Sequence, residues 1–284
     1  MFKTLKATLW PAAWLGWQIE SNWTDPFSFI AFSVAKPITG VLILVFMYYA
    51  VAGVGTDDPI YAYIFLGNTF YIYVGAVMAG ASYSILDDRE RYRTLKYIYI
   101  APISLPLYQV GRAVARFIIG TLAVVITIAV GALFFKLPLS AVQVDWGLFA
   151  LTMALGLVSL LALGVAIGTW TISIRSEPWF VGEGFAAAFY LFSGAIYPIS
   201  LLPTWLQPIG FALPITYWLE LVRRSLLGQA AADAYPTFAA WSNGDLLLAL
   251  AGITVVLIGL AAVTFNYFDH LARERGLIDV TSNF

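Results

Sequence analysis

Apolar segments long enough to cross a lipid bilayer recur along the chain, separated by short polar stretches. A bilayer core of about 30 Å requires about 20 apolar residues in a helix. Five segments reach that length, and only the first contains a charge, Lys36: residues 27–50, 61–86, 117–135, 146–174 and 246–268. The pattern predicts an all-α polytopic membrane protein, with residues 1–284 as a single transmembrane domain.

The apolar stretch of residues 179–218 differs from the others because prolines interrupt it. Proline removes a backbone donor and ends or kinks a helix. The interruptions are Pro198, Pro203, Pro208 and Pro214. We therefore expect a sixth span over 179–197 and a re-entrant segment over 198–218 that dips into the outer membrane face. Its free backbone groups need partners, so it should pack against the bundle.

Residues 1–25 are expected to form an amphipathic helix that lies in the membrane interface. Trp10, Trp14 and Trp17 recur at i, i+4 and i+7 and so share one helical face. Tryptophan favours the interface, where its ring is half buried. The alternative is a short soluble helix packed on a partner, because periodicity alone does not identify the surface that the helix meets.

The composition supports lipid as the solvent. Hydrophobic residues make up 61% and charged residues 11% of the chain, against about 45–50% and about 25% in soluble domains. The net charge of -1 gives no basis for binding nucleic acid. Without cysteine, the chain has no disulfide framework and no thiolate metal site.

Most Lys and Arg residues fall on the side of the membrane that carries the termini. Six spans place both termini on one side. Of the 15 Lys and Arg residues, 11 fall there, Lys36 lies in a span, and three fall opposite: Lys136 and, in an expected outer loop over 219–245, Arg223 and Arg224. The positive-inside rule then makes both termini cytoplasmic. We expect a multi-pass protein of a prokaryotic cell membrane, in contact with membrane lipids.

The chain lacks the chemistry of an enzyme. It contains no G-x-x-x-x-G-K-[ST] phosphate loop, so any ATP and Mg must be bound by another chain. Its one histidine, His270, cannot by itself supply the three or four ligands of a metal site. We predict no catalytic residue, no metal and no cofactor of its own. Glu183 lies within a span, where it makes either a structural polar contact or part of a pathway lining.

Residues 87–104, DDRERYRTLKYIYIAPIS, concentrate charge in an otherwise apolar chain. The stretch resembles the loop of type 2 ABC exporter permeases, with a pattern close to R-E-R-x-x-G-T-L-E-x-L-x-x-x-P-[IV]-S. The matching residues are Arg89, Glu90, Thr94, Leu95, Pro102, Ile103 and Ser104. This chain departs from the pattern at Arg93, where the family often has Gly, and at Lys96, where it often has Glu.

A second segment, residues 192–224, is similar to the family's S-G-x-x-[FY]-P stretch and the P-[IL]-T-Y stretch that follows it. The matching residues are Ser193, Gly194, Tyr197, Pro198, Leu202, Pro203, Trp205, Leu206, Pro214, Ile215, Thr216 and Tyr217. The expected order of six spans, interface helix and late re-entrant segment also agrees with the family.

The resemblance implies a coupling helix over 87–98 that seats in a groove of a cytoplasmic ATP-binding subunit. On one helix, Arg89, Arg93 and Lys96 would form a basic stripe, while Leu95 and Ile98 share an apolar side. Pro102 would end the segment. The implied coupling residues are Arg89, Glu90, Arg91, Arg93, Thr94, Leu95, Lys96 and Pro102. The alternative is a plain lipid anchor, which accounts for the Arg and Lys residues but not for the interleaved acidic ones.

The resemblance further implies an ABC exporter in which two permease chains, identical or related, flank a pathway and two ATP-binding subunits drive it. Its pathway would be lined by the second and fifth spans, here Asn68, Phe70, Tyr73, Met78, Glu183, Phe185, Phe189 and Phe192. An outer lid would include Tyr197, Pro198, Pro203 and Trp205. The apolar spans suit a lipid-like or amphipathic cargo.

Two other hypotheses remain open. An ATP-independent secondary transporter should show paired broken helices and buried ion ligands, whereas only one broken region is evident, near residue 200. A membrane scaffold subunit without a pathway is the other alternative.

Overall fold

A computed structural model describes residues 2–21, 27–28, 35–52, 59–135, 137, 144–174, 179–228 and 236–278. Within these residues every regular element is helical. The elements are α1 (Phe2–Ser21), α3 (Lys36–Ala52), α4 (Pro59–Tyr73), η2 (Val74–Met78), α5 (Ala79–Leu86), η3 (Asp87–Arg91), α6 (Leu95–Ile100), α7 (Leu105–Phe134), α8 (Trp146–Thr171), α9 (Trp179–Phe192), η4 (Ile199–Leu201), α10 (Gln207–Ala212), α11 (Pro214–Leu227), η5 (Pro236–Phe238) and α13 (Asn243–Glu274).

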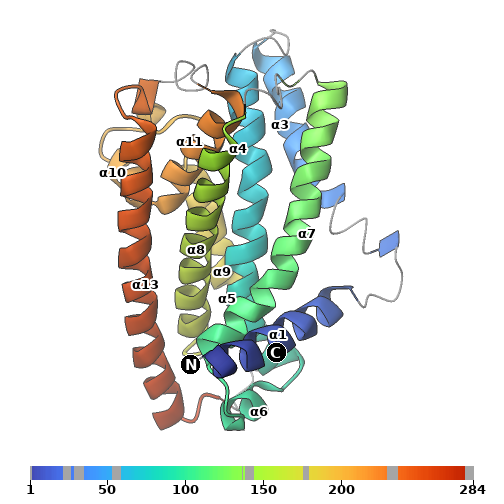
Figure 1. The fold of residues 1–284 in the computed structure, drawn as a ribbon, viewed down its shortest axis with the longest axis vertical. Coiled ribbons are helices and arrows are strands. Elements are labelled where there is room, and N and C mark those ends of the chain that lie inside the picture. Colours follow the sequence, from blue (N-terminus) through green and yellow to red (C-terminus); the bar gives the residue numbers. More distant parts are fainter. Residues whose placement is uncertain are drawn as a thin grey trace.

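The long helices run side by side along the long axis of the molecule, and α1 crosses one end of them (Figure 1). By length and composition, four helices of the described chain can cross a membrane: Ile60–Arg91, Leu105–Phe134, Trp146–Thr171 and Asn243–Glu274. Two further apolar helices, Ile38–Ala50 and Phe180–Phe192, are shorter. The expected spans one and five correspond to these short helices, so six complete spans stay a prediction.

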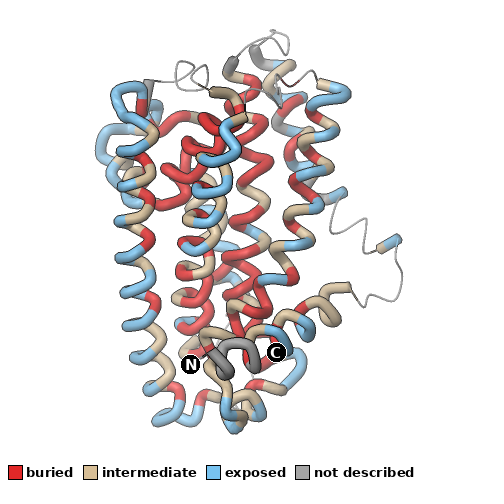
Figure 2. The backbone as a smooth tube through the Cα atoms, in the orientation of Figure 1, coloured by how far each residue is buried: buried red, intermediate tan, exposed pale blue. Residues whose placement is uncertain are grey.

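The helix formed by α4, η2, α5 and η3 is the centre of the bundle. Its most apolar window is 72% buried, whereas that of α13 is 22% buried, and Figure 2 shows the same contrast between the middle and the edge. Close packing on α8 depends on small residues. A Cβ at Gly164 would lie 2.6 Å from the Met78 carbonyl oxygen, and one at Gly168 would lie 2.9 Å from the Ser82 Cα. Glycine at these two positions therefore lets α8 approach the central helix closely.

Helix α11 corrects the first part, residues 219–227, of the expected outer loop over 219–245. The helix extends to Leu227, and almost all of its side chains are buried against α8, α13 and α4. Arg223 and Arg224 therefore lie inside the protein, at 1% and 4% exposure. Sequence reasoning missed this helix because its many polar residues suggested a solvated loop.

Arg223 ties α11 to the central helix and to the turn after α9. Its Nε donates to the Tyr63 carbonyl at 3.1 Å, and its Nη2 donates to the carbonyls of Gly194 and Ala195 at 2.9 and 3.1 Å. The guanidinium also lies 3.5 Å from the centroid of the Tyr63 ring. These contacts satisfy a buried charge with carbonyl dipoles and an aromatic face.

We expect Gly67→Ala to destabilise the protein, because Gly67 is the point where α4 meets this arginine. A Cβ there would overlap both the Arg223 Nη2 and the Ala195 carbonyl oxygen. Overpacking of this kind typically costs about 1–3 kcal/mol. Gly184→Ala, where a Cβ meets open space, should instead be neutral or stabilise α9 by up to about 1 kcal/mol. Thermal unfolding of both variants in a non-ionic detergent measures the difference, and equal midpoints would contradict this account.

Candidate functional site

The loop that follows the central helix is not one continuous helix. The π-helical turn η3 ends at Arg91, and α6 begins at Leu95. Between them Arg93 has a φ of 54°, the left-handed region, which costs a non-glycine residue about 1–2 kcal/mol. The expected coupling helix over 87–98 is therefore wrong, since the chain turns sharply at Arg93. This is the position at which the family often has Gly.

The Asp88 carboxylate holds the turn together. It is 1% exposed. Its Oδ2 accepts a hydrogen bond from the Tyr108 hydroxyl at 2.6 Å, and its Oδ1 accepts from Thr94 Oγ1 at 3.2 Å and from Arg112 Nη1 at 3.3 Å. The Thr94 backbone N–H donates to the Asp88 carbonyl at 2.7 Å. Asp88 thus joins both sides of the turn to the start of α7.

Arg89 is directed into the protein, where it caps helix α8. The residue is 5% exposed, and its guanidinium donates to the carbonyls of Thr171, Ile172 and Ile174 at 3.3, 2.7 and 3.1 Å. A cation at the last carbonyls of a helix favours the helix dipole. Its Nε pairs with Glu90 Oε1 at 2.7 Å. The expected basic stripe of Arg89, Arg93 and Lys96 is wrong because Arg89 is buried and the helix is broken.

The apolar side of α6 packs on the chain itself. Leu95 is 1% exposed and lies in a cluster with Ile85, Leu105 and Ile172, against which Ile98 packs. Leu95 therefore has no surface left for a partner's groove, whereas docking of the segment on an ATP-binding subunit stays a prediction. Leu95 instead fixes the position of α6 on the bundle.

The end of α13 also holds α6. The Arg273 guanidinium lies 4.9 Å from the centroid of the Tyr99 ring and pairs with Asp269 at 2.9 Å. Burial, and then the neighbouring Asp269 carboxylate, raise the pKa of the Tyr99 phenol above its ordinary value, so Tyr99 stays uncharged. Pro102 follows the end of α6, and Ala101 before it is extended, as proline requires of its predecessor.

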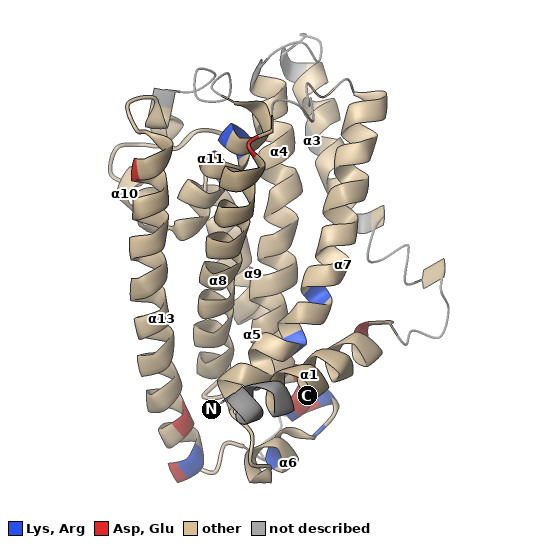
Figure 3. Ribbon diagram, viewed as in Figure 1, with Lys and Arg blue, Asp and Glu red and all other residues tan. Residues whose placement is uncertain are grey.

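The remaining residues of the loop face outward. Arg91 and Arg93 are exposed, Tyr97 is 64% exposed and Ile100 is 80% exposed. We call these four residues the loop tip. The Lys96 ammonium lies 5.7 Å from the centroid of the Tyr97 ring. Figure 3 shows that charged residues gather at this end of the bundle, around α1 and α6. The loop tip is thus a basic and aromatic surface, and the buried contacts of Asp88, Arg89 and Leu95 hold the residues beneath it in place.

A second ionic contact links α1 to the same end. Arg116 Nε on α7 pairs with Glu20 Oε1 at 2.7 Å, and Arg116 Nη2 lies 3.8 Å from Asp87 Oδ2. Helix α1 packs along α7, with Gly16 and Ala12 against its backbone and side chains. Trp10 and Trp14 of α1 are 71% and 57% exposed, Trp17 is half-buried, and all three border a groove against Val114 and Ile118 of α7.

The residues expected to line a pathway do not form one group. Phe70, Tyr73 and Met78 are buried in the core, where the rings of the first two lie 6.4 and 6.2 Å from Trp218. On α9, Glu183 is exposed, while Phe185, Phe189 and Phe192 are half-buried. Asn68 alone of the eight borders a larger cavity. A lining role for α9 stays a prediction.

The expected lid residues lie on the turn between α9 and α10. Pro198 is buried, and the Tyr197 hydroxyl donates to the Leu191 carbonyl at 2.7 Å. Pro203 is exposed, and Trp205 is 75% exposed. Helix η4 lies within this turn, α10 follows it, and α11 then runs through the interior. The segment packs on the bundle, whereas its depth in a membrane stays a prediction.

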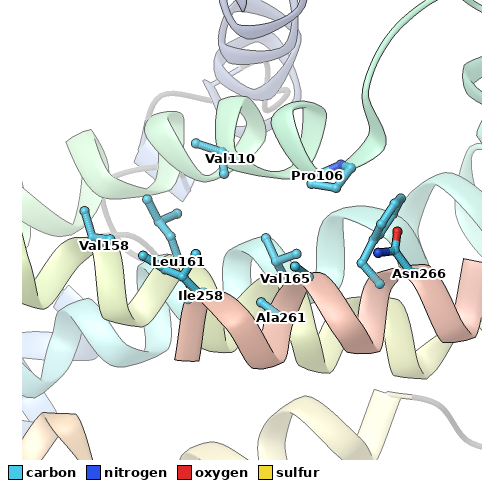
Figure 4. Close-up of a pocket in the computed structure, with 11 residues that line it drawn as sticks. Pro106, Val110, Val158, Leu161, Val165, Ile258, Ala261 and Asn266 are labelled. Atoms are coloured by element: carbon cyan, nitrogen blue, oxygen red, sulfur yellow. The ribbon is translucent and has the colours of Figure 1, made fainter. Parts of the chain in front are cut away.

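The described chain contains two notable cavities. One, of about 560 Å³, lies between α1, α3, α4, η2, α7 and α9 and includes the Arg116–Glu20 pair in its wall. The other is a groove of about 380 Å³ between α7, α8 and α13. Figure 4 shows that apolar side chains line this groove and that Asn266 is its polar exception.

Sequence reasoning missed the contribution of α7. Arg112 and Arg116 were expected only as positive charges near the membrane, yet they bind the buried Asp88 and the Glu20 carboxylate. Their spacing at i, i+4 was a usable signal, because it places both on one side of α7. The partners were not predictable, since Glu20 is 96 residues away along the chain.

These observations define a polytopic helical membrane protein of the permease class. Residues 13–227 match the sequence profile of the family described as ABC-2 type transporter. The chain therefore belongs to the ABC-2 type transporter family.

Two relatives are proteins of Escherichia coli, from strain K12 and from O157:H7, and each is described as "Probable multidrug ABC transporter permease YbhR". Each is 27% identical to this chain over 158 residues. The aligned part covers 55% of this chain and 41% of each relative, so the chain matches less than half of their length.

We expect Arg93→Gly to stabilise the loop, because glycine adopts the left-handed conformation at this position without steric cost. The gain should be about 1 kcal/mol, after the larger entropy of glycine in the unfolded chain is subtracted. Arg91→Gly is the matched control, since it removes the same charge from a helical turn and should cost about 0.5–1 kcal/mol. Thermal unfolding should rank Arg93→Gly above the parent protein and Arg91→Gly below it. A lower midpoint for Arg93→Gly would contradict the backbone assignment.

Proposed function

We propose that this chain is the membrane permease subunit of an ABC exporter, driven by ATP hydrolysis in a separate subunit. The proposed complex contains a second permease chain, identical or related, and two ATP-binding subunits that hold the ATP and Mg. The observation that carries the proposal is the division of residues 87–104 into a buried half and an exposed tip. Family membership supports the same assignment.

The buried half of the loop gives a mechanical reason for coupling. Through Asp88 the turn is bonded to α7, and through Arg89 it is bonded to the end of α8. A displacement of the loop tip must therefore move the ends of these helices or break buried charged hydrogen bonds, each of which contributes about 1.5–3 kcal/mol. Movement of an ATP-binding subunit against the tip would tilt packed helices as rigid bodies.

The loop tip has the character of a protein interface. Arginine and tyrosine are enriched at the energetic centres of interfaces, and the tip presents both beside the apolar Ile100. A plain lipid anchor would not require the buried Asp88 or the α8 cap formed by Arg89. Lys96 and Pro102 flank the proposed contact surface.

We propose a lipid-like or amphipathic cargo that leaves the cytoplasm. The cavity beside Asn68 supports this, because it combines aliphatic walls with a charged end. The relatives' description as probable multidrug permeases is compatible with an amphipathic cargo for this chain as well. Phe185, Phe189 and Phe192 on α9 are the proposed aromatic part of the pathway.

We propose six spans with both termini in the cytoplasm and an outer lid formed by residues 198–218. The start of α1 and the end of α13 lie at the same end of the bundle, which supports an even number of crossings (Figure 1). The exposed Trp10 and Trp14 support an interfacial position for α1. In this topology the loop tip faces the cytoplasm and Trp205 faces outward.

Ile100→Asp should weaken capture of an ATP-binding chain by the tagged protein. A carboxylate buried without a partner at a contact costs at least about 1.4 kcal/mol, or roughly tenfold in affinity. Leu201→Asp is the control, because Leu201 is 71% exposed on η4, away from the tip. Co-purification in mild detergent, with phosphate-loop chains identified by mass spectrometry, measures the effect. Equal recovery of the ATP-binding chain with both variants would show that the loop tip is not part of the interface.

The topology can be tested directly, because the chain contains no cysteine of its own. In intact cells, a membrane-impermeant maleimide should label Trp205→Cys and should leave Arg93→Cys unlabelled until the membrane is permeabilised. Both positions are exposed, so a failure to label reports sidedness. The reverse labelling pattern would show that the topology is opposite to the one proposed, and it would rule out the proposed role of the loop tip.

A further inference from the structure

The cavity of about 560 Å³ between α1, α3, α4, η2, α7 and α9 has two chemically different ends. Arg116 and Glu20 lie at one end, and Asn68, Tyr71 and Tyr190 lie at the other. The wall between them is aliphatic. From Asn68 to Ala76 the lining helix rises roughly 12 Å at 1.5 Å per residue. The cavity is thus an elongated slot of a size that suits a small organic ligand.

At the charged end, Arg116 and Glu20 have hydrogen-bonding groups that their mutual ion pair does not use. The Arg116 and Glu20 side chains remain 27% and 22% exposed although they pair at 2.7 Å. A guanidinium has five N–H donors, and among the described residues one of them makes a hydrogen bond, from Nε to Glu20. The Glu20 carboxylate likewise keeps an oxygen without a described donor. The slot therefore offers a cation and an anion side by side, and each can bind an opposite charge.

The other end offers no comparable capacity. The Tyr190 hydroxyl donates to the Asn68 side-chain oxygen, and the Asn68 amide donates to the Ile64 carbonyl at 2.8 Å. The Tyr71 hydroxyl donates to the Ala186 carbonyl. These polar atoms satisfy one another or the backbone, so this end presents mainly ring surfaces. An apolar tail is the part of a ligand that fits there.

The middle of the slot is open because glycines line it. A Cβ at Gly75 or at Gly40 would meet no atom within 4 Å. Gly75 lies in η2, a π-helical turn in the middle of the central helix. Such turns are rare and occur often at functional sites. The missing side chains at Gly40 and Gly75 keep this volume empty.

We propose that this slot binds a single-chain amphiphile with a zwitterionic head, of the phosphate-and-ammonium type. The phosphate would lie on Arg116 and the ammonium on Glu20, with the chain extending past Gly75 toward Tyr71 and Tyr190. A purely anionic head would meet two carboxylates, Glu20 and Asp87, around Arg116. A purely cationic head would leave the spare donors of Arg116 unused. This assignment rests on the proposed function only where the bound amphiphile is taken to be cargo.

The experiment uses the full chain in a non-ionic detergent and three probes with the same chain length: hexadecylphosphocholine, hexadecyltrimethylammonium and hexadecyl sulfate. Displacement of radiolabelled hexadecylphosphocholine measures each affinity. We expect the zwitterionic probe to bind at least about tenfold more tightly than either singly charged one, since charged hydrogen bonds contribute about 1.5–3 kcal/mol each. Equal affinities would reduce the slot to non-specific apolar binding and overturn the proposal.

Gly75→Leu should abolish this binding, because its side chain fills the slot without meeting a neighbour at Cβ. Gly184→Leu is the matched control, since Gly184 lies on α9 outside the slot and also faces open space. Leucine is a better helix former than glycine, so both variants should fold. Unchanged binding in Gly75→Leu would place the amphiphile elsewhere.

Head-group selectivity gives a result that a purely structural role would not produce. Arg116→Met should shift the preference toward the cationic probe, and Glu20→Gln should shift it toward the anionic one. Loss of all binding in both variants, with normal unfolding midpoints, would mean that the Arg116–Glu20 pair only maintains the shape of the slot. That result would overturn the assignment of the head group.

Gly75→Leu should still capture an ATP-binding chain. Loss of amphiphile binding with capture intact therefore tests this inference apart from the proposed function.

Discussion

The buried Asp88 carboxylate is the constraint on which the rest of the loop depends. Removing a carboxylate from water costs several kcal/mol unless charge and hydrogen bonds compensate it. Here Tyr108 and Arg112 of α7 and Thr94 of the loop supply the compensation. Because one donor comes from beyond the turn and two come from a neighbouring helix, together they restrict the backbone around Asp88. The left-handed conformation of Arg93 follows from that restriction.

The same end of the bundle joins the loop, the interface helix and the cavity. Arg116 lies between Glu20 of α1 and Asp87, the residue before Asp88. A ligand that competes for Arg116 at the end of the cavity would therefore act on groups one residue from the turn. The proposed contact surface and the proposed amphiphile site are thus linked through adjacent ionic contacts. In the proposed complex, such a link would give cargo and the ATP-binding subunit a physical means of influencing each other.

Buried arginines have the same structural role at two separate places in the molecule. Arg89 and Arg223 each donate to backbone carbonyls, Arg89 at the end of α8 and Arg223 at the turn after α9. Both satisfy acceptors that a helix end or turn leaves unpaired. A hydropathy pattern treats every arginine as a group that belongs in water, so it cannot identify these residues as internal ties.

The sequence by itself determined the helical membrane class and, through the residues of the loop, the family. It also located the four longest apolar helices, and the majority of their ends lie within about one turn of the expected positions. Apolar length and small-residue spacing are local properties, and Gly164 and Gly168 behave as that spacing predicts. The tertiary structure alone decided which loop residues face outward. Leu95 and Arg89 have the residue types of a contact surface, but they lie inside because Ile172 and the end of α8 come within reach only after folding. The cavity likewise requires six elements from distant parts of the chain, and no local pattern specifies how they meet.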